Sequence, residues 1–155
     1  MNLIKTNNMY YNDKTILFLD GKWVKANDAS TDLFSQTLHY GSGVFEGIRS
    51  YETEDGALVF KAKEHFERLH YSAEKMHINL NYSVEELTAL TYELLEKNNL
   101  QNAYIRPLVY LGQNMSLQPT EEVHVMLCAW SWERYLGDHQ LKLMTSSFQR
   151  PNPKS

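Results

Sequence analysis

The chain has 155 residues, of which 43% are hydrophobic and 22% charged, a composition typical of one globular domain with a sizeable core. Its formal net charge of −4 and pI near 5.8, with basic residues scattered along the chain, argue against nucleic acid as a main partner. The single cysteine, Cys128, excludes an intramolecular disulfide and a zinc cluster built from cysteines.

The chain begins with a polar segment, Met1–Asp13, which has no apolar core of a secretion signal. No later stretch approaches the roughly 18 apolar residues that are needed to span a bilayer. Together with the single cysteine, which fits a reducing compartment, these features predict a cytoplasmic protein that does not enter a membrane.

Two strand pairs are predicted in the first 60 residues. Thr15–Leu19 and Lys22–Ala26 flank Asp20-Gly21, a strong hairpin signal because glycine tolerates the positive φ that the turn requires. Val44–Tyr51 and Ala57–Phe60 form the second pair around a Glu-Asp-Gly turn. A glycine-rich turn is expected to lead into the first strand of that pair.

Two helices are predicted next. Lys63–Ile78 has apolar residues at helical spacing, and Val84–Asn98 carries a stripe of leucines. Ser83 and Glu86 have the spacing of a capping box, which indicates that the second helix begins between them.

The last predicted elements are strands. Ala103–Gly112 and Val123–Ala129 come first, a loop around Ser131–Gln140 follows, and Leu141–Ser147 is the final strand. Consecutive strands with two adjacent helices predict an α+β fold, a two-layer small domain with a mainly antiparallel sheet packed on two helices.

Two of these strands each place an arginine beside aromatic residues on one face. Arginine is always charged and grips carboxylates with a planar fork, and aromatic walls strengthen that grip by lowering the local dielectric. On the residues alone, two interpretations stay open: a pocket for a small carboxylate with an apolar part, or a solvated sheet face. The residues of these faces are Phe45, Gly47, Arg49 and Tyr51 on the first strand and Tyr104, Arg106, Leu108 and Tyr110 on the second.

Other polar residues give weaker signals. On its own, Arg68 is typical of an exposed arginine on a helix. His65, His70 and His77 are spaced by five and seven residues and lack the i, i+4 pair of a helical metal site, so no metal is predicted.

Four motifs resemble those of the branched-chain amino acid aminotransferases, which are fold-type IV, pyridoxal-phosphate-dependent enzymes of the class IV aminotransferase family. They are Leu38–Tyr51, Glu64–Ser72, Ala103–Pro107 and Trp132–Gly137, in family order and spacing. The resemblance extends from about Ile16 to Pro153 and implies the small N-terminal domain of such an enzyme.

The resemblance implies roles for particular residues. Arg68 would hold the phosphate of the cofactor, pyridoxal 5′-phosphate. Phe45 and Trp132 would wall the branched aliphatic side chain of the substrate. The full set of residues lining the substrate pocket would be Tyr40, Phe45, Gly47, Arg49, Tyr104, Arg106, Trp132 and Tyr135.

The remaining implied roles concern carboxylates and assembly. Tyr104 would help to hold the substrate α-carboxylate, and Arg106, with Tyr135 and Tyr40, would receive the distal carboxylate of glutamate. Pockets in this family are completed across a homodimer, so Tyr40 would serve the partner's site. The partners would be small amino acids and 2-oxo acids, with transfer of the amino group between Leu, Ile or Val and 2-oxoglutarate.

The Schiff-base lysine of the family is expected beyond Ser155. Ser147–Pro153 resembles the segment that precedes this lysine, and Lys154 lies too close to that segment to replace it. The expected division is a small domain over 1–129, an interdomain loop over 130–140, and the first strand of an incomplete large domain over 141–155. The 155 residues alone are therefore expected to be inactive and not to hold the cofactor, although the family is enzymatic.

Alternatives to a branched-chain aminotransferase stay open. The chain could be a non-catalytic relic of the small domain or a binding module that dimerises. Among enzymes, a D-amino-acid aminotransferase and an aminodeoxychorismate lyase are the alternatives. The sequence does not give the preference among Leu, Ile and Val.

Overall fold

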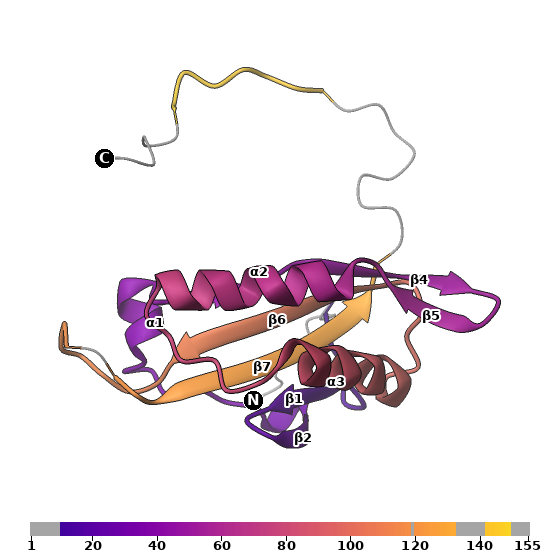
Figure 1. The fold of residues 1–155 in the computed structure, drawn as a ribbon, viewed down its shortest axis with the longest axis horizontal. Helices are drawn as coiled ribbons and strands as arrows, with labels where there is room; N and C mark the ends of the chain where they lie inside the picture. The colour runs from indigo at the N-terminus through magenta and orange to yellow at the C-terminus, as the bar shows by residue number, and fades with distance from the viewer. Residues whose placement is uncertain (1–9, 119, 133–141, 150–155) are drawn as a thin grey trace, which may run out of the picture.

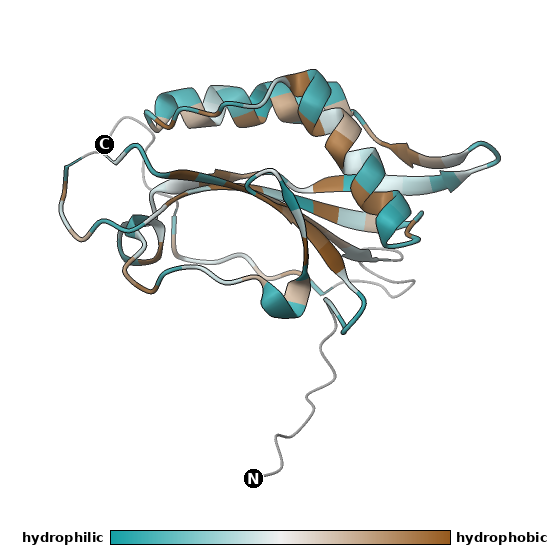
Figure 2. Ribbon diagram, turned by 90° about the horizontal axis from the view of Figure 1, so that it is seen from below, coloured by the Kyte–Doolittle hydropathy of each residue, from teal (hydrophilic) through white to brown (hydrophobic). Residues whose placement is uncertain are grey.

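A computed structural model describes residues 10–118, 120–132 and 142–149 of the chain, and the first two of these ranges form two layers (Figure 1). One layer is an antiparallel sheet, and the other consists of α2 (Ala62–Lys75) and α3 (Val84–Lys97), which lie on the same face of the sheet (Figure 2). The predicted α+β fold with two helices on a mainly antiparallel sheet is confirmed.

The strands run in the order β2-β1-β7-β6-β4-β5, and β3 also pairs with β6. Every strand pair among the described residues is antiparallel. The bounds are β1 Ile16–Leu19, β2 Lys22–Lys25, β3 Gly43–Phe45, β4 Ile48–Thr53, β5 Gly56–Val59, β6 Ala103–Leu111 and β7 Val123–Ser131; a 3₁₀ turn at Ala26–Asp28 and the short helix α1 at Gln36–Tyr40 complete the elements.

The first hairpin forms as its turn residues predict. Asp20 has φ of 49° and Gly21 has φ of 81°, the two positive values that a two-residue turn matching the strand twist requires. Leu19 then pairs with Lys22 and the strands continue in register. The predicted capping box of α3 is also present, with Ser83 and Glu86 each bonding the other's backbone N–H.

The predicted strand Val44–Tyr51 is divided into β3 and β4 by a proline on the neighbouring strand. Phe45 pairs with Leu108 and Ile48 pairs with Ile105, so the same register runs through both strands. At the position between them, the Glu46 N–H donates to the Pro107 carbonyl at 3.1 Å. Proline has no N–H to return the second bond of this pair, so the ladder is interrupted while the alternation of faces continues.

The core lies between the sheet and the two helices. Side chains from both layers are completely buried there, and their close packing accounts for most of the stability of the domain. The fully buried side chains include Phe66 and Leu69 of α2, Leu87 and Leu94 of α3, and Ile48, Ile105, Val109 and Leu127 of the sheet.

Helix α1 was not predicted. Its entry is fixed by contacts to residues far along the chain: the Ser35 hydroxyl donates to the Leu111 carbonyl at 2.6 Å, and the Gln36 amide donates to the Ser116 carbonyl at 3.1 Å. The helix ends at Gly41, which has φ of 71°. Because these partners are distant in the chain, no local pattern indicates the helix.

The predicted last strand, Leu141–Ser147, does not form in the part of it that the structure describes. Residues 142–149 carry no strand, and Leu143, Met144 and Phe148 are each at least 90% exposed. A strand needs a neighbour to accept its hydrogen bonds, and the described residues provide none for this segment. Within the described residues, none of the helices combines the length and apolar character needed to cross a bilayer.

Candidate active site

The predicted pocket residues gather on the face of the sheet that the helices leave open. In β6, residues 103, 105, 107 and 109 are buried against the helices, so Tyr104 and Arg106 point to the other side. Strand pairing sets Arg49 of β4 beside Tyr104 and sets Trp130 of β7 on its other side. Phe45 and Gly47 follow the same alternation and lie on this open face.

Arg106 is a charged residue of this face that has no carboxylate partner among the described residues. Its guanidinium lies over the Phe45 ring, 4.3 Å from the ring centroid, and its Nη2 donates to the Tyr104 hydroxyl at 2.8 Å. Its Nε is buried and has no hydrogen-bond partner among the described residues, and no described carboxylate pairs with the side chain. A partly buried guanidinium without a counter-charge is costly unless an anion can approach it.

Arg49 is tied to the end of β7. Its Nη2 donates to the Trp132 carbonyl at 2.7 Å, and its guanidinium lies 5.7 Å from the centroid of the Tyr51 ring. The Trp132 N–H in turn donates to the Asn102 carbonyl at 3.2 Å. These bonds hold Trp132 beside β6 after the strand has ended.

An aromatic wall surrounds the arginines. The Tyr104 ring stacks on Trp130 at 4.9 Å and lies 5.5 Å from Trp132, while Tyr10 meets Trp130 edge-on at 5.3 Å. With Arg106, these four aromatic residues line a pocket of about 400 Å³. The pocket is thus apolar on its walls and cationic at one point, a combination suited to small molecules that carry a carboxylate.

Gly47 is required by the position of Tyr104. A Cβ at residue 47 would clash with the Tyr104 hydroxyl and lie 3.0 Å from its ring carbon Cζ. The missing side chain therefore lets Tyr104 lie flat against β4 and reach Arg106.

Two lining residues were not predicted. Trp130 would have been found if the predicted strand Val123–Ala129 had been extended by two residues. Period-2 alternation then puts Trp130 on the same face as Cys128 and Trp132. Tyr10 belongs to the polar N-terminal segment, and no sequence pattern connects it with the pocket. The prediction from its apolar strand would place Cys128 in the core, but it lies half-buried on the open face; burial raises the pKa of its thiol to about 11, so the thiol stays protonated near neutral pH.

Arg68 lies apart from this pocket, on α2, on the helix side of the sheet. Its Nε and Nη2 donate to the two carboxylate oxygens of Glu46 at 2.7 and 2.6 Å, and His65 Nδ1 lies 2.9 Å from Glu46 Oε2. Burial raises the pKa of Glu46, but the hydrogen bonds from Arg68 and His65 outweigh it, so that the pKa is lowered overall. The hydrogen bonds to Glu46 raise the pKa of Arg68.

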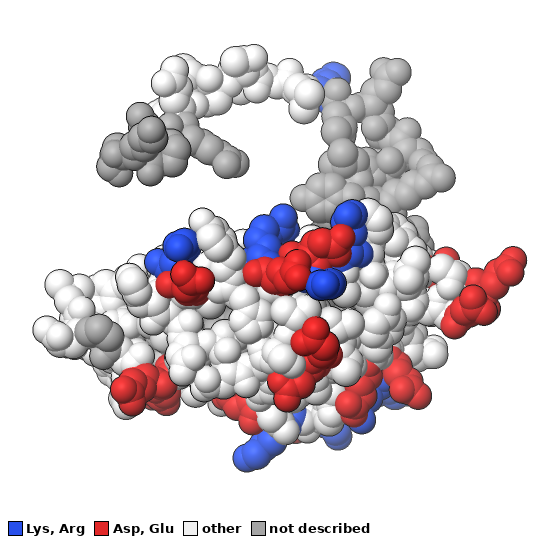
Figure 3. All heavy atoms as spheres, in the orientation of Figure 1, with Lys and Arg blue, Asp and Glu red and all other residues white. Residues whose placement is uncertain are grey.

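The rest of the outer side of α2 shows mixed charge. Lys and Arg side chains are interspersed with Asp and Glu over this helix (Figure 3), and ion pairs join Lys61 to Glu64 and Lys63 to Glu67. The Arg68 side chain is 62% exposed, so its remaining Nη1 faces solvent with no hydrogen-bond partner among the described residues. That free edge fits a contact with a phosphate group.

Of the eight residues predicted to line the substrate pocket, three line the aromatic pocket: Tyr104, Arg106 and Trp132. Phe45, Gly47 and Arg49 lie beside it on the same face and approach its lining residues. The other two predicted residues are not brought to it by the described structure. Tyr40 lies in α1, where its hydroxyl donates to the Met115 carbonyl at 3.0 Å and its side chain is 47% exposed. Tyr135 lies outside the described residues.

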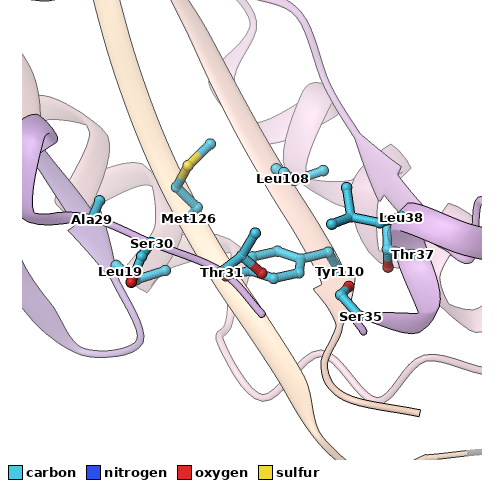
Figure 4. A pocket seen from close by; sticks show the side chains of 10 residues that line it. All are labelled: Leu19, Ala29, Ser30, Thr31, Ser35, Thr37, Leu38, Leu108, Tyr110 and Met126. Carbon is cyan, nitrogen blue, oxygen red and sulfur yellow. The ribbon is translucent and has the colours of Figure 1, made fainter. Parts of the chain in front are cut away.

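A second pocket, of about 260 Å³, opens on the same face of the sheet (Figure 4). Leu108 and Tyr110 of β6 and Met126 of β7 form its floor, and the segment 29–38 forms its walls. The Tyr110 ring also stacks on His124 at 4.9 Å. None of its lining residues is charged, so among the described residues it offers no counter-charge for a carboxylate.

The chain is therefore an α+β domain whose open sheet face combines one cationic group with aromatic walls, a lining suited to a carboxylate. Residues 43–155 match the family described as Amino-transferase class IV, and the chain belongs to that family. It is 42% identical over 141 residues to the branched-chain-amino-acid aminotransferase of Pseudomonas aeruginosa, a match that covers 87% of this chain and 46% of that protein.

Solved structures agree with the family. The branched-chain amino acid aminotransferase of Escherichia coli superposes with a TM-score of 0.85 and is 36% identical, and the match covers 92% of this chain and 49% of that one. The T.th. branched-chain amino acid aminotransferase, 35% identical with a TM-score of 0.73 over 77% of this chain and 41% of that one, has been solved with N-(5′-phosphopyridoxyl)-L-glutamate and with 4-methylvaleric acid. The chain spans about half the length of these relatives.

Proposed function

We propose that the chain forms the small-domain side of the active site in a branched-chain amino acid aminotransferase. The reaction moves an amino group between Leu, Ile or Val and 2-oxoglutarate. One observation carries this proposal: the Arg106 guanidinium is held between Phe45 and Tyr104 inside an aromatic pocket, with no anionic partner among the described residues.

Such a pocket meets the two demands of this reaction. The side chain of leucine is apolar and that of glutamate is anionic, and both must occupy the same space in the two halves of the reaction. The aromatic wall of Tyr104, Trp130 and Trp132 contacts the apolar side chain, and Arg106 donates a charge-assisted hydrogen bond to the anionic one. The two ligands solved with the T.th. relative, one derived from glutamate and one a branched apolar acid, support this double use.

Each pocket residue then has a defined task. Tyr104, hydrogen-bonded to Arg106, presents its hydroxyl to the substrate α-carboxylate, and Gly47 leaves the space that this hydroxyl needs. Arg49 fixes Trp132 by donating a hydrogen bond to the Trp132 carbonyl. Trp132 and Phe45 can then line the space for an aliphatic side chain of the substrate. Tyr135 is assigned to the distal carboxylate with Arg106.

The residues present fit pyridoxal 5′-phosphate as the cofactor. Arg68 offers an exposed guanidinium edge for its phosphate. When bound, the cofactor supplies an electron sink for chemistry at the substrate Cα, and the protein contributes orientation, charge and exclusion of water. The Schiff-base lysine is assigned to a position beyond Ser155, and without it residues 1–155 would neither retain the cofactor nor turn over.

The assembly and location belong to the same proposal. The predicted boundary at residue 129 moves to Ser131, where β7 ends. The proposed division is then a small domain up to Ser131, a connecting loop over 132–140 and the beginning of a large domain over 141–155, in a cytoplasmic homodimer. The exposed apolar side chains on and before α1, Leu33, Phe34, Leu38 and Tyr40, support a protein partner on that surface, with Tyr40 serving the partner's pocket. The free cysteine supports a reducing compartment.

The test replaces the matching half of the Escherichia coli enzyme by residues 1–155 and measures transamination between leucine and 2-oxoglutarate. The unaltered Escherichia coli enzyme and its second half alone serve as controls. Turnover with leucine, isoleucine and valine supports the proposal. A folded hybrid that carries the cofactor but turns over only D-alanine, only aminodeoxychorismate or nothing would refute it.

A further inference from the structure

Glu46 is a carboxylate at a position that the pleat of the sheet assigns to the core. It is only 6% exposed, and its neighbours on the same side of the chain, Val44 and Ile48, are buried apolar residues. Its backbone is fixed by the hydrogen bond to the Pro107 carbonyl at the interruption between β3 and β4. A carboxylate in such a place is strongly destabilising unless it is paired, so the groups that pair with it show what it does.

Both oxygens of Glu46 are occupied by α2. Oε1 accepts from Arg68 Nε at 2.7 Å, and Oε2 accepts from Arg68 Nη2 at 2.6 Å, with His65 Nδ1 at 2.9 Å from the same oxygen. The fork of Arg68 therefore meets the carboxylate along one edge in the bidentate geometry that fixes both position and angle.

This contact determines what the rest of Arg68 can do. The carboxylate end of the pair is buried, whereas the Arg68 side chain is 62% exposed, so the guanidinium projects from a rigid base toward solvent. Nη1 has no partner among the described residues. An arginine on a helix surface normally samples many rotamers, and here that freedom has been removed before any ligand arrives.

We propose that Glu46 is a positioning residue that fixes the Arg68 guanidinium so that its free Nη1 edge is ready for the cofactor phosphate. His65 supports this arrangement through its Nδ1, which lies 2.9 Å from Glu46 Oε2 and 3.1 Å from Arg68 Nη2. The inference rests on the proposed function, since it concerns the phosphate of the same cofactor, and it adds two residues to the phosphate grip that do not touch the phosphate themselves.

Charge and geometry predict opposite effects for the change Glu46→Gln. Removing a negative charge next to Arg68 would strengthen attraction of a phosphate if charge alone mattered. Releasing the guanidinium would weaken the affinity, because the binding edge is no longer held in place. The high exposure of Arg68 screens the charge effect, so the loss of orientation should dominate.

The test measures the dissociation constant of pyridoxal 5′-phosphate for the apo form of the complete aminotransferase, next to that of pyridoxal, which has no phosphate. For Glu46→Gln we expect about 10-fold weaker binding of pyridoxal 5′-phosphate or more, the size typical of removing an orienting partner behind a binding group. Pyridoxal binding should change little. On an Arg68→Gln background, Glu46→Gln should cause no further loss.

Glu46→Asp provides a second test by the same measurement if the Glu46→Gln variant does not fold. It keeps the charge but shortens the side chain, so it should also weaken the binding of pyridoxal 5′-phosphate and leave that of pyridoxal unchanged. Equal losses for both ligands, tighter binding of the phosphate ligand, or additive losses with Arg68→Gln would overturn the inference. Failure of the proposed function would appear differently, as a lack of pyridoxal 5′-phosphate binding in the unaltered protein.

Discussion

Arg106→Leu in the complete enzyme should change substrate choice more than it changes overall activity. The guanidinium is the one cationic group in the described lining of the aromatic pocket, and it already lacks a carboxylate partner among the described residues. Losing a hydrogen bond to a charged group costs about 1.5–3 kcal/mol, which is about 10- to 150-fold in kcat/KM. This cost should fall on 2-oxoglutarate, because the side chain of the leucine-derived oxo acid makes no such bond.

The assay compares kcat/KM for 2-oxoglutarate and for 4-methyl-2-oxopentanoate in the unaltered enzyme and the variant. Tyr110→Phe, on the same face of the same strand, is the control and should leave the ratio of the two values unchanged. Arg106→Leu removes a buried Nε that has no hydrogen-bond partner among the described residues. The variant should therefore keep the melting temperature of the unaltered enzyme although its specificity for 2-oxoglutarate falls. Equal losses for the two oxo acids would refute the role given to Arg106.

Three further predictions concern single side chains. Gly47→Ala should displace Tyr104 and lower kcat/KM for leucine by up to about 100-fold, since a small misplacement of a positioning group has effects of that size; unchanged kinetics would contradict the close contact. Phe66→Ala should lower the free energy of unfolding in urea by about 3–5 kcal/mol, whereas Tyr71→Ala, exposed on the same helix, should stay within about 0.5 kcal/mol. The lowered pKa of Glu46 makes its contribution to stability fully present above its ordinary value of 4.5 and lost as the pH falls through the folded-state value. Between about pH 6 and pH 3 the unaltered protein should therefore lose more stability than Glu46→Gln, and parallel losses would show that this carboxylate is not responsible.

The sequence predicts the two arginine-bearing faces because strand alternation is a local property. Once Ala103–Gly112 is recognised as a strand, the positions of Tyr104 and Arg106 on one face follow from the pleat, and the structure has them there. The same alternation correctly groups Phe45, Gly47 and Arg49. The interruption between β3 and β4 was not predicted, because it depends on which residue lies opposite Pro107, and pairing register is not visible in either strand alone.

Contacts between distant segments account for the other differences. Helix α1 depends on Leu111 and Ser116, and the pocket wall includes Tyr10, which meets Trp130 from the far end of the chain. Alternation assigns Glu46 to the helix side of the sheet, but the sequence does not show which residue of α2 lies opposite it. Only its burial under α2 shows that it pairs with Arg68.

The segment from Phe45 to Gly47 serves both sides of one sheet with three consecutive residues. Phe45 and Gly47 shape the substrate side, and Glu46 between them anchors the arginine on the helix side. Deleting or inserting a single residue here would turn every following side chain to the opposite side, placing a carboxylate in the aromatic pocket and a phenyl ring under Arg68. The length of this segment is therefore as strictly constrained as its composition.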